Sequence, residues 1–237
     1  MQGAVSKVIL LAFLASIYPS KAQTPEVVLY GEALCPYTIA AVKDVIGPLF
    51  DGGLAGRFTF RYVAYGNART SSAGVTCQHG PAECRLNRVI NCAEELSTSD
   101  AQFMAFLRCV AQAGRGGEAA VDGCAKAAKL SPEDISQCAT GEDGGTLERK
   151  AAAETGALRP AHTYVPWLVV NGVPLGEDDV NLYKYICVAS GQDKPEECLA
   201  PPDPSAKALF STRMGAEGVV RSRPGPLATE DLDATTT

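Results

Sequence analysis

The chain has 237 residues, of which 46% are hydrophobic and 20% charged. This composition is ordinary for a globular protein and excludes collagen, a coiled coil and a wholly disordered chain. The net charge is −6 at pH 7, and an acidic chain is a poor ligand for nucleic acid or anionic lipid. We therefore expect neither nucleic acid nor a membrane among its partners.

The first 22 residues are typical of a secretory signal peptide. Lys7 supplies the positive start, residues 8–17 form an apolar run, and Ser20 and Ala22 are the small residues that a signal peptidase reads. The run is short for a membrane span, which leaves a buried core helix as the alternative. We expect residues 1–22 to be removed and the remaining chain to enter an oxidising compartment.

The next segment predicts strand, helix and strand. Residues 26–31 are apolar and end in Gly31, and Pro36 suits the first turn of a helix whose apolar face runs to Leu49. Gly47-Pro48 should kink or end that helix. Residues 57–65 alternate in the manner of a second strand. This order is the opening of a βαβ unit and predicts an α/β fold.

A cysteine-rich, mostly helical stretch over about residues 76–155 interrupts this pattern. Strand character returns at residues 164–170, and Asn171-Gly172 indicates a tight hairpin. A last helix is expected over residues 178–189. We expect one domain over residues 23–200, with the helical stretch as an insertion, and a disordered tail over residues 201–237.

Nine cysteines leave at least one thiol outside intramolecular bridges. Cys35 lies far from the others along the chain, so we expect it to remain a thiol. The other eight can form four disulfides: Cys77, Cys84, Cys92, Cys109, Cys124, Cys138, Cys187 and Cys198. We expect Cys187 to pair with Cys198 because the pair is local and flanks the end of the last helix. We also expect a bridge between Cys77 and Cys92, for which no such local argument is available.

Cys35 occupies a special place between a strand and a helix. Helix N–H groups and the helix dipole favour the thiolate there, so we expect a lowered pKa and a nucleophilic sulfur. The usual redox motif is Cys-x-x-Cys, whereas this chain has Cys35-Pro36-Tyr37-Thr38. The Thr38 hydroxyl can hydrogen-bond to the thiolate but cannot form a disulfide. Turnover would then need an external thiol, such as glutathione or a dithiol. The alternative is a buried, inert cysteine.

A second motif supports this interpretation. It reads Cys77-Gln78-His79-Gly80, two residues, Glu83-Cys84, two residues, Asn87, four residues, Cys92. This pattern resembles the signature of the gamma-interferon-inducible lysosomal thiol reductases. The resemblance implies a thioredoxin-like fold with a helical insertion, and reduction of protein disulfides. It places Cys35 at the attacking position and Thr38 where most members have the resolving cysteine.

The resemblance extends to residues 162–167. Pro166 matches the proline of thioredoxin-like folds that is normally cis and leaves the preceding backbone open to a substrate strand. Val165 and Pro166 are therefore candidate substrate-binding residues. A trans proline at the start of an edge strand is the alternative.

Metal binding and acid–base catalysis are rival interpretations of the second motif. Cys77, His79, Cys84 and Cys92 do not have the usual zinc-ligand spacing, so we expect no metal there. His79 and His162 could be acid–base groups, but a structural role beside a bridge or loop is the favoured interpretation of both.

The sequence thus predicts a thiol-disulfide oxidoreductase that reduces disulfide-containing proteins through Cys35 and a mixed-disulfide intermediate, with no bound cofactor. We expect it in the secretory pathway, either extracellular or in a lysosome or vacuole. One alternative is a thiol-dependent binding or chaperone-like module that has lost catalysis. Another is a structural, disulfide-rich extracellular domain.

Overall fold

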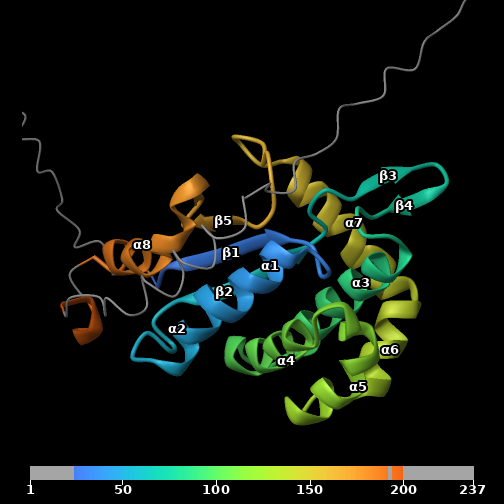
Figure 1. The fold of residues 1–237 in the computed structure, drawn as a ribbon, viewed down its shortest axis with the longest axis horizontal. Coiled ribbons are helices and arrows are strands. Elements are labelled where there is room, and N and C mark those ends of the chain that lie inside the picture. The colour runs from blue at the N-terminus through green and yellow to red at the C-terminus, as the bar shows by residue number, and fades with distance from the viewer. Residues whose placement is uncertain (1–23, 192–193, 200–237) are drawn as a thin grey trace, which may run out of the picture.

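The computed structural model describes residues 24–191 and 194–199. The expected signal peptide and tail lie outside these residues. A four-stranded sheet runs through the molecule in the order β2-β1-β5-β6 (Figure 1). Its strands are β1 (Glu26–Gly31), β2 (Thr59–Ala64), β5 (Trp167–Val170) and β6 (Val173–Pro174). β1 is parallel to β2 and antiparallel to β5, and β5 is antiparallel to β6.

The crossover from β1 to β2 is helical, as the sequence predicts. It consists of α1 (Pro36–Ala40), a π-helical turn (Ala41–Ile46) and α2 (Gly47–Asp51). The helix does not end at Gly47-Pro48. The π-helical turn ends two residues before Pro48, which has no N–H to donate, and the helical path then continues through α2.

The hairpin between β5 and β6 turns at Asn171-Gly172, as predicted. Both residues have positive φ, 47° and 78°, which is the conformation that favours this sequence in a two-residue hairpin turn. The helix α8 (Leu182–Ala189) follows, between two short 3-10 helices (Gly176–Asn181 and Glu196–Leu199).

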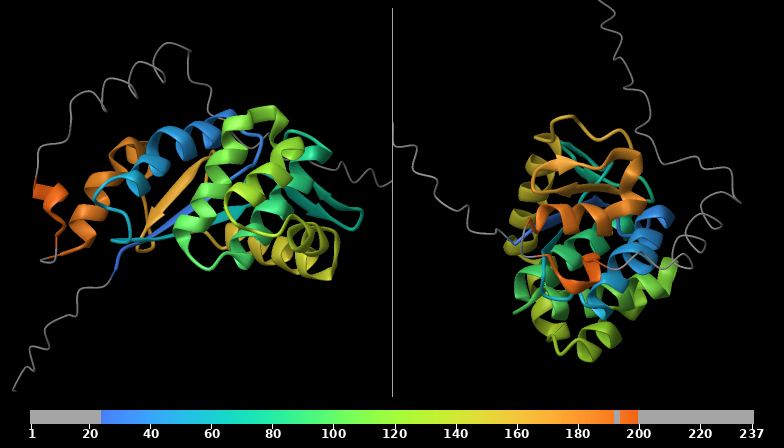
Figure 2. Two further views of the ribbon diagram at one scale, coloured as in Figure 1. Left: turned by 90° about the horizontal axis from the view of Figure 1, so that it is seen from below. Right: turned by 90° about the vertical axis from the view of Figure 1, so that its left-hand side faces the viewer.

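The helical stretch lies between β2 and β5. After the hairpin β3 (Arg69–Ser71) and β4 (Gly74–Thr76) come α3 (Pro81–Leu96), α4 (Asp100–Ala113), a 3-10 turn (Gly114–Gly116), α5 (Gly117–Ala127), α6 (Pro132–Thr140) and α7 (Glu142–Gly156). Helices α4, α5 and α6 group together beside the sheet (Figure 2). Ser99 and Ser131 cap α4 and α6 through their side chains, which accept N–H groups of the first turns.

Alternation along β1 divides the core between the two faces of the sheet. Val27 and Leu29 belong to the larger cluster, which α3, α4 and α8 complete. Val28 and Tyr30 belong to a smaller cluster on the other face, where α7 contributes Ala151. The helical stretch therefore covers both faces of the sheet and holds the end of β1 between them.

The edge strand β2 is closed by side chains rather than by another strand. The outward backbone N–H groups of three alternate residues each donate a hydrogen bond to a side-chain oxygen. These residues are Phe60, Tyr62 and Ala64. Their acceptors are Asp100 Oδ2 at 2.7 Å, Glu94 Oε1 at 3.0 Å and Asn91 Oδ1 at 3.1 Å, respectively. These contacts satisfy an edge that would otherwise be open to pairing with another chain.

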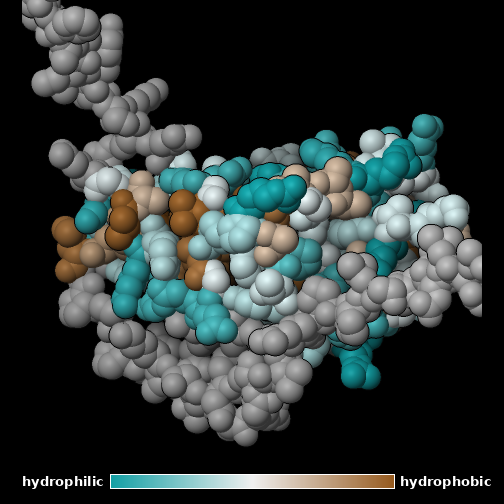
Figure 3. All heavy atoms as spheres, turned by 90° about the horizontal axis from the view of Figure 1, so that it is seen from above, coloured by the Kyte–Doolittle hydropathy of each residue, from teal (hydrophilic) through white to brown (hydrophobic). Residues whose placement is uncertain are grey.

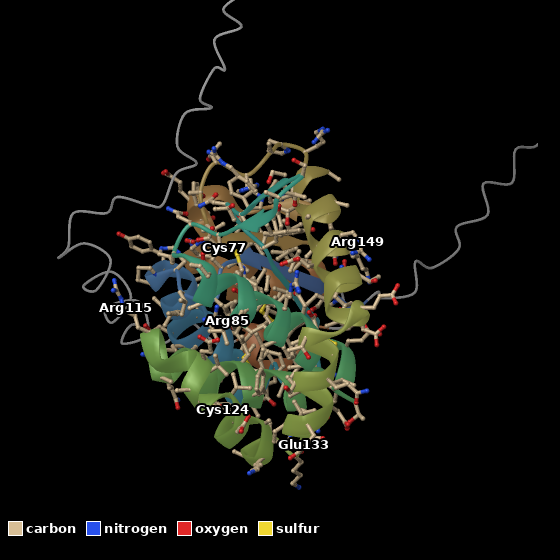
Figure 4. All side chains as sticks on the ribbon, turned by 90° about the vertical axis from the view of Figure 1, so that its right-hand side faces the viewer. Cys77, Arg85, Arg115, Cys124, Glu133 and Arg149 are labelled. Carbon is tan, nitrogen blue, oxygen red and sulfur yellow. A yellow bond between two sulfur atoms is a disulfide. The ribbon has the colours of Figure 1, made fainter. Side chains whose placement is uncertain are left out.

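Four disulfides join the eight cysteines other than Cys35. The pairs are Cys77–Cys84, Cys92–Cys138, Cys109–Cys124 and Cys187–Cys198. Figure 4 labels Cys77 and Cys124, one member each of two bridges. The expected Cys187–Cys198 pair is confirmed.

The expected Cys77–Cys92 pair is wrong. Cys84 lies in the first turn of α3, directly across the turn at Gly80 from Cys77. Cys92 lies two turns further along α3, where α6 presents Cys138. Two turns of α3 therefore separate Cys92 from the Cys77–Cys84 bridge.

Within the described residues, no helix combines the length and apolarity that crossing a membrane would need. On the face drawn in Figure 3, hydrophobic side chains gather at the end of the molecule where α8 lies. Val188, on α8, is among the most exposed large apolar residues at 73%.

Candidate active site

Cys35 lies where the sequence predicts, at the N-cap of α1 and four residues after the end of β1. It is outside the four disulfides and its side chain is fully buried. Pro36 begins the helix, where its missing N–H is not needed. The fold thus supplies a thiol at a helix N-terminus, but one shielded from solvent.

Each backbone N–H of the loop before Cys35 is hydrogen-bonded. The Ala33 N–H donates to Asn87 Oδ1 at 2.9 Å and the Leu34 N–H to Glu83 Oε2 at 3.3 Å. The Glu32 N–H donates to Thr38 Oγ1 at 3.4 Å, and the Cys35 N–H to the Glu32 carbonyl at 3.3 Å. Two of the four acceptors come from the first two turns of α3, so this helix positions the loop.

Thr38 is buried in the first turn of α1. Its close packing depends on Gly31, because a Cβ at that position would come within 2.6 Å of Thr38 Cγ2 and 3.1 Å of Tyr62 Cε2. Real Cβ atoms do not approach so closely, so a side chain at the last residue of β1 would force Thr38 or its neighbours to shift. Thr38 therefore has a structural role in this loop as well as its place near the thiol.

The pKa of the Cys35 thiol is raised, not lowered as the sequence predicts. Burial is the largest cause, and the nearby Glu32 carboxylate adds to it. The hydroxyl and backbone N–H of Thr38 and the N–H of Tyr37 oppose this rise. The helix N-terminus acts in the predicted direction, but removal of the thiolate from water outweighs it.

Val165 and Pro166 lie at the same end of the sheet as Cys35. Both are buried, and the Val165–Pro166 peptide is cis, as predicted. In the β1–β5 ladder Tyr30 is opposite Trp167. Pro166, which directly precedes β5, therefore lies at the end of the sheet where β1 ends and the loop to Cys35 begins. A second cis bond, Arg159–Pro160, was not predicted.

The cysteines of the second motif are not available as zinc ligands, because Cys77, Cys84 and Cys92 all form disulfides. The motif's histidine has a different partner. His79 Nδ1 lies 2.7 Å from Glu83 Oε2 and 3.4 Å from Glu32 Oε2. Burial, with the neighbouring Glu83 carboxylate, raises the pKa of Glu32 to about 8. His162 lies elsewhere, half-buried, and burial lowers its pKa.

Sequence reasoning missed Glu32 as part of the site and gave no role to Glu83 or Asn87. The signal for Glu32 was an acidic residue immediately after an apolar strand and three positions before Cys35. The spacing of Glu83 and Asn87, four residues apart on a helix, was a signal that they share a face.

Two cavities lie elsewhere. One of about 230 Å³ opens between β2, α3 and α7, with Arg61, Glu94 and Glu154 in its wall. The other, of about 700 Å³, lies beside the Cys77–Cys84 bridge and includes Arg85, which Figure 4 labels. Cys35 is fully buried, so access to its sulfur requires movement of the residues around it.

A solved structure shares this fold. BdbD from Bacillus subtilis in its oxidised form superposes with a TM-score of 0.53 and 16% sequence identity, over 72% of this chain and 89% of that one. The arrangement is thioredoxin-like, with a helical insertion and a cysteine at the first helix. The chain therefore has a thioredoxin-like fold.

Sequence comparisons give the family. The model of the family "Gamma interferon inducible lysosomal thiol reductase (GILT)" matches residues 26–128. A gamma-interferon-responsive lysosomal thiol protein of Arabidopsis thaliana is 33% identical over 186 residues, which are 76% of this chain and 77% of the relative. A gamma-interferon-inducible lysosomal thiol reductase of Mus musculus is 36% identical over 62% of this chain and 61% of that protein. The chain belongs to the GILT family, whose members are thiol-disulfide oxidoreductases.

Proposed function

We propose that this protein reduces disulfides of client proteins through Cys35 alone. The observation that carries the proposal is the position of Cys35 at the N-cap of α1, while the other eight cysteines form disulfides. The cis Val165–Pro166 bond at the same end of the sheet supports a role for these two residues in holding an extended client segment.

The chemistry requires three thiol–disulfide exchanges. The Cys35 thiolate attacks one sulfur of a client disulfide, the client S–S bond breaks, and the departing client sulfur takes a proton. An external thiol then attacks the Cys35 sulfur of the mixed disulfide and releases the second client thiol. A second external thiol restores Cys35 and leaves an oxidised external disulfide. With Thr38 in place of a cysteine, no sulfur in the first turn of α1 can perform this second exchange.

Several features support a place in the secretory pathway. Four disulfides form and persist in an oxidising compartment, and residues 1–22 have the pattern of a signal peptide. The names of the plant and mouse relatives contain the word lysosomal. We propose export from the cell or delivery to a lysosome or vacuole, with glutathione or a dithiol as reductant.

The test compares wild-type protein with Cys35→Ser, which keeps the size of the side chain. We expect the wild type to reduce insulin disulfides in the presence of glutathione and to form adducts with clients that resist non-reducing electrophoresis. Cys35→Ser should lose both. Adducts without turnover would indicate the binding module instead, and no Cys35-dependent adducts would indicate a structural domain.

A further inference from the structure

Three side chains converge beside the loop that carries Cys35. Glu32 follows β1, His79 precedes α3 and Glu83 lies in the first turn of α3. His79 Nδ1 and one carboxylate oxygen of each glutamate all lie within 4.8 Å of one another. Both glutamates are fully buried, whereas the His79 side chain is 27% exposed. The cluster is therefore enclosed by protein but can be reached from solvent through the histidine.

The two carboxylates are held in similar ways. Glu32 Oε1 accepts the Asn67 N–H at 2.7 Å, and Glu83 Oε1 accepts the His79 N–H at 2.9 Å. These hydrogen bonds leave the Oε2 atom of each carboxylate directed at the His79 ring. Glu83 Oε2 also accepts the Leu34 N–H at 3.3 Å. Backbone donors of this kind orient carboxylate ligands at metal sites.

The hydrogen bonds of the cluster do not satisfy all its atoms. The Nδ1 atom of an imidazole carries at most one hydrogen, whatever the charge of the ring. His79 Nδ1 lies 2.7 Å from Glu83 Oε2, so the one hydrogen that Nδ1 can share lies between these two atoms. Glu32 Oε2 is fully buried, lies 3.4 Å from the same nitrogen and accepts no hydrogen bond. A buried carboxyl oxygen without a hydrogen-bond partner is costly, and a cation among the three atoms would satisfy it while displacing the proton that Glu32 retains below its pKa of about 8.

We propose that Glu32, His79 and Glu83 form a binding site for a divalent transition-metal cation, with Zn²⁺ as the best-matched ion. Imidazole nitrogen and carboxylate oxygen are zinc ligands at about 2.0–2.2 Å. Donor atoms around a tetrahedral zinc ion then lie roughly 3.4 Å apart. The Nδ1 to Glu32 Oε2 distance already has this value. The shorter Nδ1 to Glu83 Oε2 distance has to open on binding.

Coordination number separates zinc from the common hard cations. Three protein donors leave one tetrahedral position for water, which is an ordinary zinc arrangement. Ca²⁺ prefers six to eight oxygen ligands and Mg²⁺ six, and a ring nitrogen suits neither. The donor set differs from the cysteine-containing set considered above, because it uses no sulfur. A bound ion would join the end of β1 to the start of α3, on which the Cys35 loop depends.

The experiment uses the Cys35→Ser protein without a polyhistidine tag, so that neither the thiol nor a tag can bind metal. After chelator treatment, calorimetric titration with Zn²⁺ should show one ion per chain. Glu32→Gln and His79→Ala should each weaken binding roughly 10-fold or more. Matched controls are His162→Ala, the other histidine of the chain, and Glu94→Gln, a half-buried glutamate on α3 outside the cluster. Both should bind as the parent does.

Co²⁺ provides a second readout, because its visible spectrum reports ligand type and geometry. A tetrahedral spectrum that disappears in His79→Ala is expected. Circular dichroism establishes whether each variant is folded. If a variant is unfolded, Zn²⁺ binding by the Cys35→Ser parent alone tests the proposal. Absence of stoichiometric Zn²⁺ binding by the folded parent overturns the proposal, as does unchanged affinity in folded Glu32→Gln and His79→Ala. None of these results depends on the redox activity of Cys35.

Discussion

At the scale of single residues, the reactivity of Cys35 is a balance between burial and the helix N-terminus. The N–H groups of Tyr37 and Thr38 and the Thr38 hydroxyl favour the thiolate, while burial and Glu32 oppose it. Burial prevails, so the resting thiol is protected rather than activated. Contact with a client requires the sulfur to become accessible, which makes the surroundings of Cys35 part of the reaction.

Replacing Thr38 by cysteine should restore an internal route out of the mixed disulfide. A thiol in the same helical turn has an effective concentration of about the mM range or above, so turnover with a dithiol should rise roughly 10-fold or more. Insulin-reduction rates and the lifetime of client adducts on non-reducing gels measure this. Thr38→Ser is the control, since it keeps the hydroxyl and adds no sulfur. Equal rates for the two variants would contradict the single-cysteine mechanism.

Gly31→Ala tests the packing beneath the site. The added Cβ would lie 2.6 Å from Thr38 Cγ2, so we expect a loss of about 1–3 kcal/mol in unfolding free energy. Urea unfolding under non-reducing conditions measures the loss. Thr38→Ser removes that methyl group and should recover part of it in the double variant. Gly123→Ala is the control, because nothing lies within 4 Å of the new Cβ there.

At the scale of elements, α3 organises the site. Its first turns offer Glu83 and Asn87 to the Cys35 loop, and its later turns offer Asn91 and Glu94 to the edge of β2. These polar side chains of α3 accept the backbone N–H groups of the Cys35 loop and of the β2 edge, which no neighbouring strand within the described residues pairs with. The same helix joins α6 through the Cys92–Cys138 bridge.

Asn87→Ala should therefore destabilise the protein and loosen the Cys35 loop. It leaves the buried Ala33 N–H without its acceptor, at a cost of about 1–3 kcal/mol. The measurements are urea unfolding and native-state iodoacetamide labelling of Cys35, which should become faster. Arg85→Ala on the same helix breaks only an exposed ion pair with Glu118, so little change is expected. Equal effects of the two variants would contradict the role given to Asn87.

Glu94 makes the stability of this region pH-dependent. Burial, opposed by the Tyr62 N–H and Arg61 and aided by Asp100 and Glu154, raises its pKa to about 7. Because the folded-state pKa lies above the unfolded value, Glu94 contributes fully below about pH 4.5 and its contribution is lost as the pH rises through about 7.

Glu94→Gln should flatten this dependence. Between about pH 4.5 and 7 the wild type should lose up to ~1.4 kcal/mol per pH unit relative to Glu94→Gln, which has no titrating group. Parallel urea unfolding of both proteins across this range gives the difference. A constant difference between the two would show that Glu94 does not titrate within the folded protein in this window.

At the scale of the whole molecule, disulfides that close loops of different lengths stabilise the helical stretch. Cys92–Cys138 spans 46 residues and Cys77–Cys84 spans seven. Chain-entropy arguments give a stabilisation of about 4 kcal/mol for the long bridge and about 2 kcal/mol for the short one. Replacing both members of each pair by serine should therefore cost more stability at Cys92–Cys138. Non-reducing urea unfolding tests the order, and a larger loss at Cys77–Cys84 would reverse it.

The sequence alone determined the features that depend on local chemistry. An apolar run ending in glycine became β1, Pro36 placed the start of α1, and Asn171-Gly172 made the hairpin because few residues tolerate its positive φ values. The odd number of cysteines and the isolation of Cys35 indicated which sulfur stays a thiol. The motif around Cys84 resembled the family that the comparisons confirmed.

Only the tertiary structure decided how these pieces act on one another. The pKa of Cys35, the partner of Cys77 and the convergence of Glu32 with His79 and Glu83 all depend on which elements pack together. Burial and long-range contacts carry no local signature, because the residues that remove a thiol from water are distant along the chain. The sequence therefore identified the reactive atom, and the packing of α3 against the end of β1 set its environment.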